Sequence, residues 1–230
     1  MPLVQAVLDN LDLILKGFGY TIALFLISAV LSLALGTFLV AMRVGPVAVM
    51  RKAAATYVTL VRNTPLLIVF LFFVIAGPKL GINFKWLDVH IGPFDFTSFF
   101  GAAVAALSLY TSTFVCEALR SGVNAVPLGQ SEAARAIGLT FAGGMRQVVL
   151  PQAVRASVPP LASTMIALVK NTSVAAVFGV AEAVSRMRAL TNNNAGDRWE
   201  IFIVIALGYI ILVELISAVA IVLERRWRIA

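Results

Sequence analysis

Residues 18–42 have the sequence FGYTIALFLISAVLSLALGTFLVAM, which contains no charged side chain. Crossing a bilayer takes roughly 20 consecutive, mostly apolar residues, so this stretch predicts a membrane-spanning helix. The whole chain of 230 residues is 60% hydrophobic and 13% charged, against about 45–50% apolar and about 25% charged residues in soluble domains. This composition excludes an ordinary soluble globule and a disordered chain. The single cysteine, Cys116, excludes a disulfide-stabilised scaffold.

Four further stretches are long and apolar enough to predict spans. They are residues 53–77, interrupted by Arg62, residues 96–116, residues 153–181 as one irregular helix, and residues 201–223, interrupted by Glu214. We therefore expect an all-α membrane protein in which residues 1–230 form a single domain with about five transmembrane helices. The segments 78–95 and 182–200 are expected to be polar loops on one side of the membrane.

The distribution of basic residues predicts the orientation of the chain. Five spans place the termini on opposite sides, and with the N-terminus outside, ten basic residues lie in the inner segments and six in the outer segments. The inner ones are Arg43, Arg51, Lys52, Arg120, Arg135, Arg146, Arg155, Arg225, Arg226 and Arg228. This excess predicts an outside N-terminus and an inside C-terminus. The net charge of +7 is then explained by topology, and no nucleic-acid partner is expected.

The N-terminal residues do not have the pattern of a cleaved signal peptide. Asp9 and Asp12 occupy the region where such a peptide carries basic residues. We therefore expect the helix that begins at Phe18 to be retained.

The inner segment 120–152 has the pattern of a protein-docking loop. Residues 131–137 are mostly good helix formers, and Gly138 can end that helix in the left-handed conformation. A second amphipathic stretch follows, with Phe141, Met145, Val148 and Val149 on one stripe. We expect Pro151 to end it. Two short helices that meet at a glycine corner would present small alanines and a charged rim to another protein.

This loop carries a resemblance to a known family. Glu132-Ala133-Ala134, then Gly138, then Val149-Leu150-Pro151 resembles the cytoplasmic coupling loop of ABC importer permease subunits. Two further motifs, Arg62-Asn63-Thr64-Pro65 and Lys170-Asn171-Thr172-Ser173, are similar to motifs of the branch that imports polar amino acids. Residues 110–122 and 129–135 also resemble that branch, and are most similar to actinobacterial glutamate-uptake permeases.

The resemblance implies that the coupling loop docks on a separate ATPase dimer. Its coupling residues would be Glu132, Ala133, Ala134, Arg135, Gly138, Leu150 and Pro151. The chain contains no Gly-Lys dipeptide and so lacks the phosphate-binding loop of P-loop ATPases. ATP and magnesium are therefore expected on the partner, with no cofactor on this chain and no enzymatic activity of its own.

Further partners follow from the same resemblance. They are a second permease subunit, identical or related, and an extracytoplasmic solute-binding protein that delivers the substrate. The expected location is the bacterial plasma membrane, which the chain crosses several times.

Polar residues inside the predicted spans mark a candidate substrate path. A charge at the bilayer centre costs at least about 2.5–3.5 kcal/mol, so it should face a cavity or a partner. Arg62 precedes Pro65, which removes a backbone donor and opens the helix. The candidate path residues are Arg62, Asn63, Thr64, Pro65, Lys170, Asn171, Thr172 and Ser173.

Two of these residues have alternative interpretations. The planar guanidinium of Arg62 suits a substrate α-carboxylate or an acid on a gating partner, but Arg62 could instead pair structurally with Glu117 or Glu214. Lys170 could bind an amino-acid head group or extend to the membrane surface. Glu117 is expected to pair with Arg120 one turn later. Glu214 requires a partner on this chain or on the second permease.

Other polar or small residues predict packing. Ser28, Ser32 and Gly36 share one helix face and are expected to pack against another helix. His90 has no neighbouring ligand cluster, so no metal site is expected. Cys116 is expected to pack in the interior.

Three other functions remain open from the sequence. The chain could carry another polar or cationic amino acid. It could be an ATP-independent secondary carrier, although only Glu117 and Glu214 could then form a coupling-ion site and the docking loop would have no use. It could also be a membrane scaffold without transport, which would not explain a buried arginine or broken helices.

Overall fold

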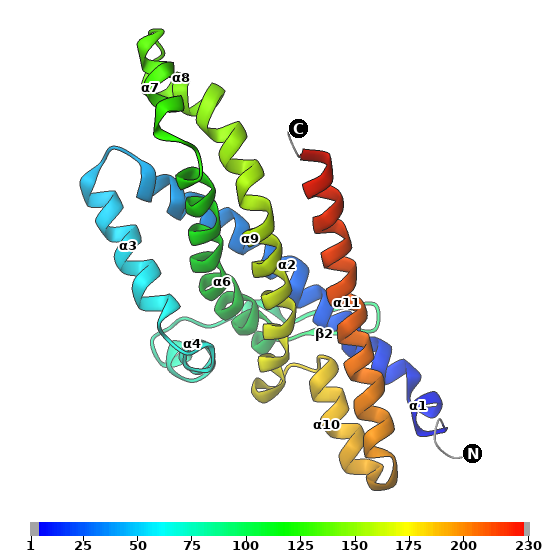
Figure 1. The fold of residues 1–230 in the computed structure, drawn as a ribbon. Coiled ribbons are helices and arrows are strands. Elements are labelled where there is room, and N and C mark those ends of the chain that lie inside the picture. Colours follow the sequence, from blue (N-terminus) through cyan, green and yellow to red (C-terminus); the bar gives the residue numbers. More distant parts are fainter. Residues whose placement is uncertain (1–4, 228–230) are drawn as a thin grey trace.

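The computed structural model describes residues 5–227 and is a bundle of long helices (Figure 1). A short helix α1 (Gln5–Asp9) precedes α2 (Leu11–Val44), which has 34 residues and is about 51 Å long at 1.5 Å per residue. The helix begins before the predicted Phe18. Its first turn contains Asp12, whose negative charge is favourable at a helix N-terminus. Since α2 is longer than the roughly 30 Å hydrocarbon core, it crosses at a tilt or extends beyond it.

The second predicted span is broken. Helix α3 (Ala48–Arg62) ends before Pro65, and α4 (Leu66–Leu71), the π-helical turn η1 (Phe72–Ala76) and α5 (Gly77–Lys79) follow. The two halves are bent by 102°. The sequence predicted one span with a local opening, whereas the structure has two helical segments separated by a sharp bend. Within residues 5–227, four helices can each cross a membrane, and the bent pair would make a fifth.

The backbone groups at this break have local partners. The Thr64 hydroxyl donates to the carbonyl of Leu60 at 2.9 Å, and the Thr64 amide donates to Val61 at 3.2 Å. The carbonyl of Pro65 accepts from Ile68 at 2.9 Å and starts α4. These bonds satisfy groups that a proline leaves unpaired, as a break at membrane depth requires.

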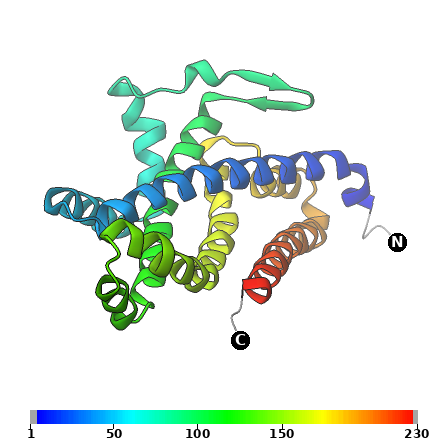
Figure 2. The same ribbon diagram turned by 90° about the horizontal axis from the view of Figure 1, so that it is seen from above.

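The segment expected as a polar loop contains a β-hairpin. After a 3₁₀ turn η2 (Lys85–Leu87), strands β1 (Val89–Ile91) and β2 (Phe94–Phe96) pair antiparallel. The turn begins with Gly92 at a φ of 57°, a conformation that glycine adopts without strain. In Figure 2 the hairpin lies on one side of α2 and α11 on the other. The prediction of a plain loop is wrong here, and the next helix begins at Ser98 rather than Phe96.

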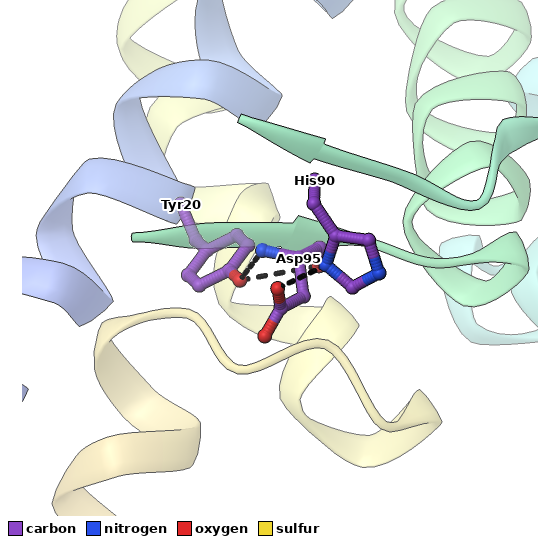
Figure 3. Close-up of polar contacts among 3 residues, drawn as sticks. All are labelled: Tyr20, His90 and Asp95. Atoms are coloured by element: carbon purple, nitrogen blue, oxygen red, sulfur yellow. Dashed lines mark hydrogen bonds and ion pairs between the residues drawn. The ribbon is translucent and has the colours of Figure 1, made fainter. Parts of the chain in front are cut away.

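A buried tyrosine attaches the hairpin to α2 (Figure 3). The hydroxyl of Tyr20 donates to the Asp95 carbonyl at 3.1 Å and accepts from the Asp95 amide at 2.7 Å. The Asp95 carboxylate pairs with Nδ1 of His90 at 2.6 Å on the exposed surface. This hydrogen bond from His90 lowers the pKa of Asp95. Within residues 5–227 no group of three or more histidine, cysteine, aspartate or glutamate side chains is placed to hold a metal ion.

The third span, α6 (Ser98–Asn124), packs closely on α2. Ser28, Ser32 and Gly36 are buried on α2, and a Cβ atom on Gly36 would lie 2.4 Å from Cγ1 of Val115 of α6. The expectation of a packing face of small residues is confirmed. Cys116 is likewise fully buried.

The coupling-loop segment forms one short helix and then joins the fourth span without a break. Helix α7 (Leu128–Ala136) is followed by α8 (Phe141–Gly144), the π-helical turn η3 (Met145–Val149) and α9 (Leu150–Asn171). Residues 141–178 form one continuous helical path. The prediction that Pro151 ends a helix is wrong, because it lies in the first turn after a π-turn, where its missing amide is tolerated.

The second predicted outer loop is also helical. After the 3₁₀ helix η4 (Thr172–Phe178) come α10 (Ala183–Asn193), the 3₁₀ turn η5 (Ala195–Asp197) and α11 (Arg198–Trp227). Figure 1 shows α7 at one end of the molecule and α10 at the other, here called the α7 end and the α10 end.

A buried acid holds α10 in place. Glu182 is fully buried, and its carboxylate accepts the Ser185 amide and the Tyr209 hydroxyl, each at 2.8 Å. Burial raises the pKa of Glu182 above its usual value. This acid therefore caps α10 and connects it to α11.

The Tyr20 attachment can be tested by removing one atom. Tyr20→Phe leaves the Asp95 amide and carbonyl without this partner, which costs about 1–3 kcal/mol. We expect faster amide hydrogen exchange in residues 89–96 of the variant. Tyr57→Phe removes a comparable hydroxyl, one that donates to Leu109 at 3.0 Å, and should leave hairpin exchange unchanged. Equal exchange in wild type and Tyr20→Phe would contradict the attachment.

Candidate functional site: an interhelical cavity and an exposed loop

Gly138 forms the corner that the sequence predicts. Its φ is 87°, in the left-handed region that favours glycine. The Gly138 amide donates to Arg135 at 2.9 Å, and the Leu139 amide donates to Ala134 at 3.1 Å. This pair of bonds is a Schellman motif, which ends α7 and turns the chain toward α8.

The predicted coupling residues fall on different faces of the loop. Ala134 is 3% exposed and packs against Gly144, where a Cβ would lie 3.7 Å from its methyl group. Glu132, Ala133 and Arg135 are exposed on α7. Leu150 and Pro151 are exposed on the continuous helix beyond.

Three large apolar side chains are exposed around the same loop. Leu128 is 79%, Ile137 78% and Phe141 64% exposed. Phe141 therefore does not share a buried stripe with Val149, as its spacing suggested, because the π-turn shifts the helix face. Exposed apolar side chains beside exposed charges are typical of a protein-binding surface.

A cavity of about 370 Å³ lies between α6 and α9. Its lining residues combine apolar groups with hydroxyls and an amide. They are Tyr110, Thr111 and Phe114 from α6 and Ser163, Thr164, Ala167, Leu168 and Asn171 from α9. Asn171 is the only predicted path residue among these lining residues.

Arg62 contacts Phe114, one of the residues that line this cavity. Its guanidinium carbon lies 5.8 Å from the centre of the Phe114 ring, within range of a cation–π contact. Arg62 is exposed, and no ion pair to it is found among residues 5–227. Arg62 forms no ion pair with Glu117 or Glu214 within the described residues, so the structural alternative is wrong for this chain.

Lys170, Thr172 and Ser173 do not join this cavity. The Thr172 hydroxyl donates to Val169 at 2.7 Å, and the Ser173 hydroxyl donates to Lys170 at 2.6 Å. These bonds stabilise the change from α9 to the 3₁₀ helix η4. Lys170 is exposed. Asn63 and Pro65 are exposed at the break before α4, and Thr64 bonds to its own backbone.

The acids in the spans differ in their environment. Glu117 pairs with Arg120 at 3.6 Å, as predicted, and also with Arg43 of α2, which sequence spacing could not reveal. Glu214 is exposed on α11, and within residues 5–227 no ion pair to it is found.

One buried hydroxyl in the cavity has no partner in the described part of the chain. Thr111 is 3% exposed, lines the cavity, and its Oγ1 makes no hydrogen bond. A buried unpaired hydroxyl costs free energy, which a bound polar ligand would recover. Oγ1 itself is hidden from solvent within the cavity wall, so an occupant would reach this hydroxyl only when α6 and α9 move apart.

A family model matches residues 32–229. It describes the inner membrane component of binding-protein-dependent transport systems. The chain belongs to this family. It is a multi-pass membrane protein and a permease component.

Individual relatives agree with this assignment. The glutamate transport system permease protein GluC of Corynebacterium efficiens is 44% identical over 86% of this chain and 87% of its own. The glutamate/aspartate import permease protein GltJ of Escherichia coli is 34% identical over 93% and 87%. The probable glutamine ABC transporter permease protein GlnM of Bacillus subtilis is 32% identical over 97% of each chain.

Solved structures share the fold. A crystal structure of an amino acid ABC transporter with histidines matches with a TM-score of 0.83 and 27% identity, over 96% of this chain and 97% of that chain. An inward-facing MetNI methionine ABC transporter matches with a TM-score of 0.73 and 20% identity, over 96% and 99%. The chain is thus a permease subunit of an amino-acid importer.

The sequence did not reveal most of the cavity. Tyr110, Thr111, Ser163 and Thr164 are polar residues in otherwise apolar helices, which was the available signal. Their convergence depends on which faces of α6 and α9 meet, and that requires the fold.

The variant Thr111→Val tests whether the Thr111 hydroxyl binds the substrate or has only a structural role. Valine has nearly the same shape, so removing the unpaired hydroxyl should leave the permease as stable as wild type or more stable. Substrate uptake by the assembled transporter should fall by about fivefold to tenfold, since one hydrogen bond is worth about 1 kcal/mol or somewhat more.

Ser28→Ala is the matched control. Its hydroxyl is also buried and unpaired but belongs to the α2 packing face outside the cavity. Thermal unfolding and uptake of both variants in proteoliposomes give the comparison. Unchanged uptake in Thr111→Val would mean that this hydroxyl does not meet the substrate.

Proposed function

We propose that this chain is the permease subunit of an ATP-driven importer whose substrate is glutamate. The cavity between α6 and α9, which has a few polar groups in a mostly apolar lining, carries this proposal. Relatives named for glutamate transport match most of the chain at 44% and 34% identity. The substrate would pass this cavity on its way between the two ends of the bundle.

The chemistry of the cavity suits an amino acid. Arg62 lies at its edge over Phe114, and a guanidinium can hold a carboxylate by two parallel hydrogen bonds. The Thr111 hydroxyl and the Asn171 amide can bond to polar groups of the same molecule. Asn63, Thr64 and Pro65 would shape the path at the helix break. Lys170, with Thr172 and Ser173 behind it, would add positive charge along the path of an anionic substrate.

Coupling to ATP hydrolysis would occur at the α7 end. The exposed Glu132, Ala133 and Arg135 would enter a groove of an ATPase subunit, with buried Ala134 and the corner at Gly138 fixing the angle of α7. Leu150 and Pro151 would flank this contact. ATP and magnesium would remain on the ATPase dimer, with no cofactor on this chain.

The proposed orientation follows from the basic residues. The α7 end and the C-terminus lie in the cytoplasm, and the α10 end lies outside, so residues 1–230 act as one transmembrane domain with the coupling loop at about 120–152. A solute-binding protein would deliver the substrate at the α10 end. A second permease, identical or related, would complete the path and would meet the exposed Glu214.

The second candidate is import of another polar or cationic amino acid. The relative named as a probable glutamine permease is 32% identical, so the cavity could serve a neutral side chain as well. An ATP-independent carrier is disfavoured because it has no use for the exposed loop.

Substrate competition tests the choice of amino acid. The assembled transporter, with its solute-binding protein, is reconstituted in vesicles and supplied with labelled glutamate and unlabelled glutamine, arginine or histidine. We expect glutamate to saturate uptake at the lowest concentration, with inhibition by vanadate. A flat response to glutamate would refute it as the substrate.

Arg62→Lys tests the carboxylate contact. Lysine keeps the positive charge but loses the planar fork, so we expect the KM for uptake to rise by about tenfold, as a lost charge-assisted hydrogen bond implies. The variant should unfold at the same temperature as wild type, which shows that it is folded. An unchanged KM would contradict a bidentate contact.

Glu132→Lys tests the docking of α7. Reversing this exposed charge should leave the permease folded and reduce substrate-stimulated ATP hydrolysis by about tenfold or more, as for a charged contact in an interface. Glu224→Lys reverses an acid on α11 instead and should leave hydrolysis unchanged. Equal stimulation in wild type and Glu132→Lys would show that the ATPase does not use this face.

A further inference from the structure

Three charged side chains join α2 and α6 near the α7 end. Arg43, in the last turn of α2, pairs with Oε1 of Glu117, and Arg120 lies 3.6 Å from Oε2 of the same acid. The side chains of Arg43 and Glu117 are only 14% and 29% exposed. Their attraction is therefore less screened than that of a surface ion pair. We call these three residues the charge joint.

The charge joint lies where three helices are packed together. Cys116, the neighbour of Glu117, is fully buried in a cluster with Leu39 and Val40 of α2 and with Ala54 and Val58 of α3. The apolar cluster holds the helices together but is non-directional. The charge joint fixes the position of α2 relative to α6, because the energy of an ion pair depends on the position of each charged atom.

The same end of α6 is fixed to α9 on its other side. A Cβ on Gly122 would lie 1.9 Å from Oγ of Ser157 and 2.3 Å from the carbonyl of Ala153. No other side chain fits there, so the backbones of α6 and α9 touch. Since α7 connects these two helices, α6, α7 and α9 form one frame at this end. The charge joint connects α2 to that frame.

We propose that Arg43, Glu117 and Arg120 are positioning residues that make α2 follow the frame when the ATPase displaces α7. Axial sliding of α2 would separate Arg43 from Glu117 and would also disrupt the close fit of Gly36 against Val115. The charge joint therefore converts movement of the loop into movement of the longest span. This inference rests on the proposed function, since it concerns the coupling of transport to ATP hydrolysis.

The experiment measures substrate moved per ATP hydrolysed by the complete transporter in vesicles. Glu117→Gln keeps the size of the side chain and removes its charge. We expect this ratio to fall by at least about fivefold, the lower end of typical coupling between sites, while ATP hydrolysis continues. Arg120→Gln should have a smaller effect, because Arg120 is farther from Glu117 and more exposed. Glu224→Gln, which removes the charge of a glutamate on α11 outside the charge joint, is the matched control and should leave the ratio unchanged.

The exchanged variant Arg43→Glu/Glu117→Arg distinguishes coupling from packing. It restores opposite charges across the α2–α6 contact and should recover at least half of the wild-type ratio. Slow alkylation of the buried Cys116 by a maleimide reports that each variant is folded. If Glu117→Gln is not folded, the exchanged variant alone decides.

Two results would overturn the inference. The first is a folded Glu117→Gln variant that moves as much substrate per ATP hydrolysed as wild type. The second is an exchanged variant whose ratio of substrate to ATP does not recover. If the wild-type transporter itself moves no amino acid, the proposed function fails. If wild type transports and the variants stay coupled, only the role of the charge joint fails.

Discussion

The contact between α6 and α9 at Gly122 is the constraint on which the functional parts of this permease depend. A side chain at this position would collide with Ser157 and with the Ala153 carbonyl. The two helices therefore approach to backbone contact near the α7 end. Farther along, the same helices line the cavity that includes Thr111 and Asn171. One helix pair thus holds the loop at one end and the candidate substrate site along its length.

This arrangement gives a physical route from the loop to the cavity. Helix α7 connects the ends of α6 and α9 through the Schellman corner at Gly138 and the continuous helix that begins at Phe141. A displacement of α7 therefore acts on both walls of the cavity. The unpaired hydroxyl of Thr111 lies on one wall, so a small change in helix separation alters its distance from an occupant. Arg62, the last residue of α3 before the break at Pro65, lies near the same cavity through its contact with Phe114.

The sequence predicted the features that depend on neighbouring residues. The opening of the helix at Pro65, the left-handed corner at Gly138 and the pairing of Glu117 with Arg120 are local. The structure contains the corner and the pair, and at Pro65 it has a full break rather than a local opening. It could not predict that a π-turn would let the helix continue through Pro151, because the turn is stabilised by packing of the whole loop. The cavity and the Arg43–Glu117 pair depend on residues far apart in the chain, so only the fold reveals them. Glu182 was assigned to a loop because its buried partners, Ser185 apart, come from other helices.

The central claim is that the α7 end of this permease receives force from an ATPase subunit. Crosslinking tests it most directly. A cysteine replaces exposed Ile137 in a Cys116→Ser background, and a matched cysteine replaces exposed Trp86 near the hairpin, each in the complete transporter. The account predicts a crosslink to the ATPase from Ile137→Cys that changes with bound nucleotide, and none from Trp86→Cys. A crosslink from Trp86→Cys alone, or from neither position in an active transporter, would contradict the account.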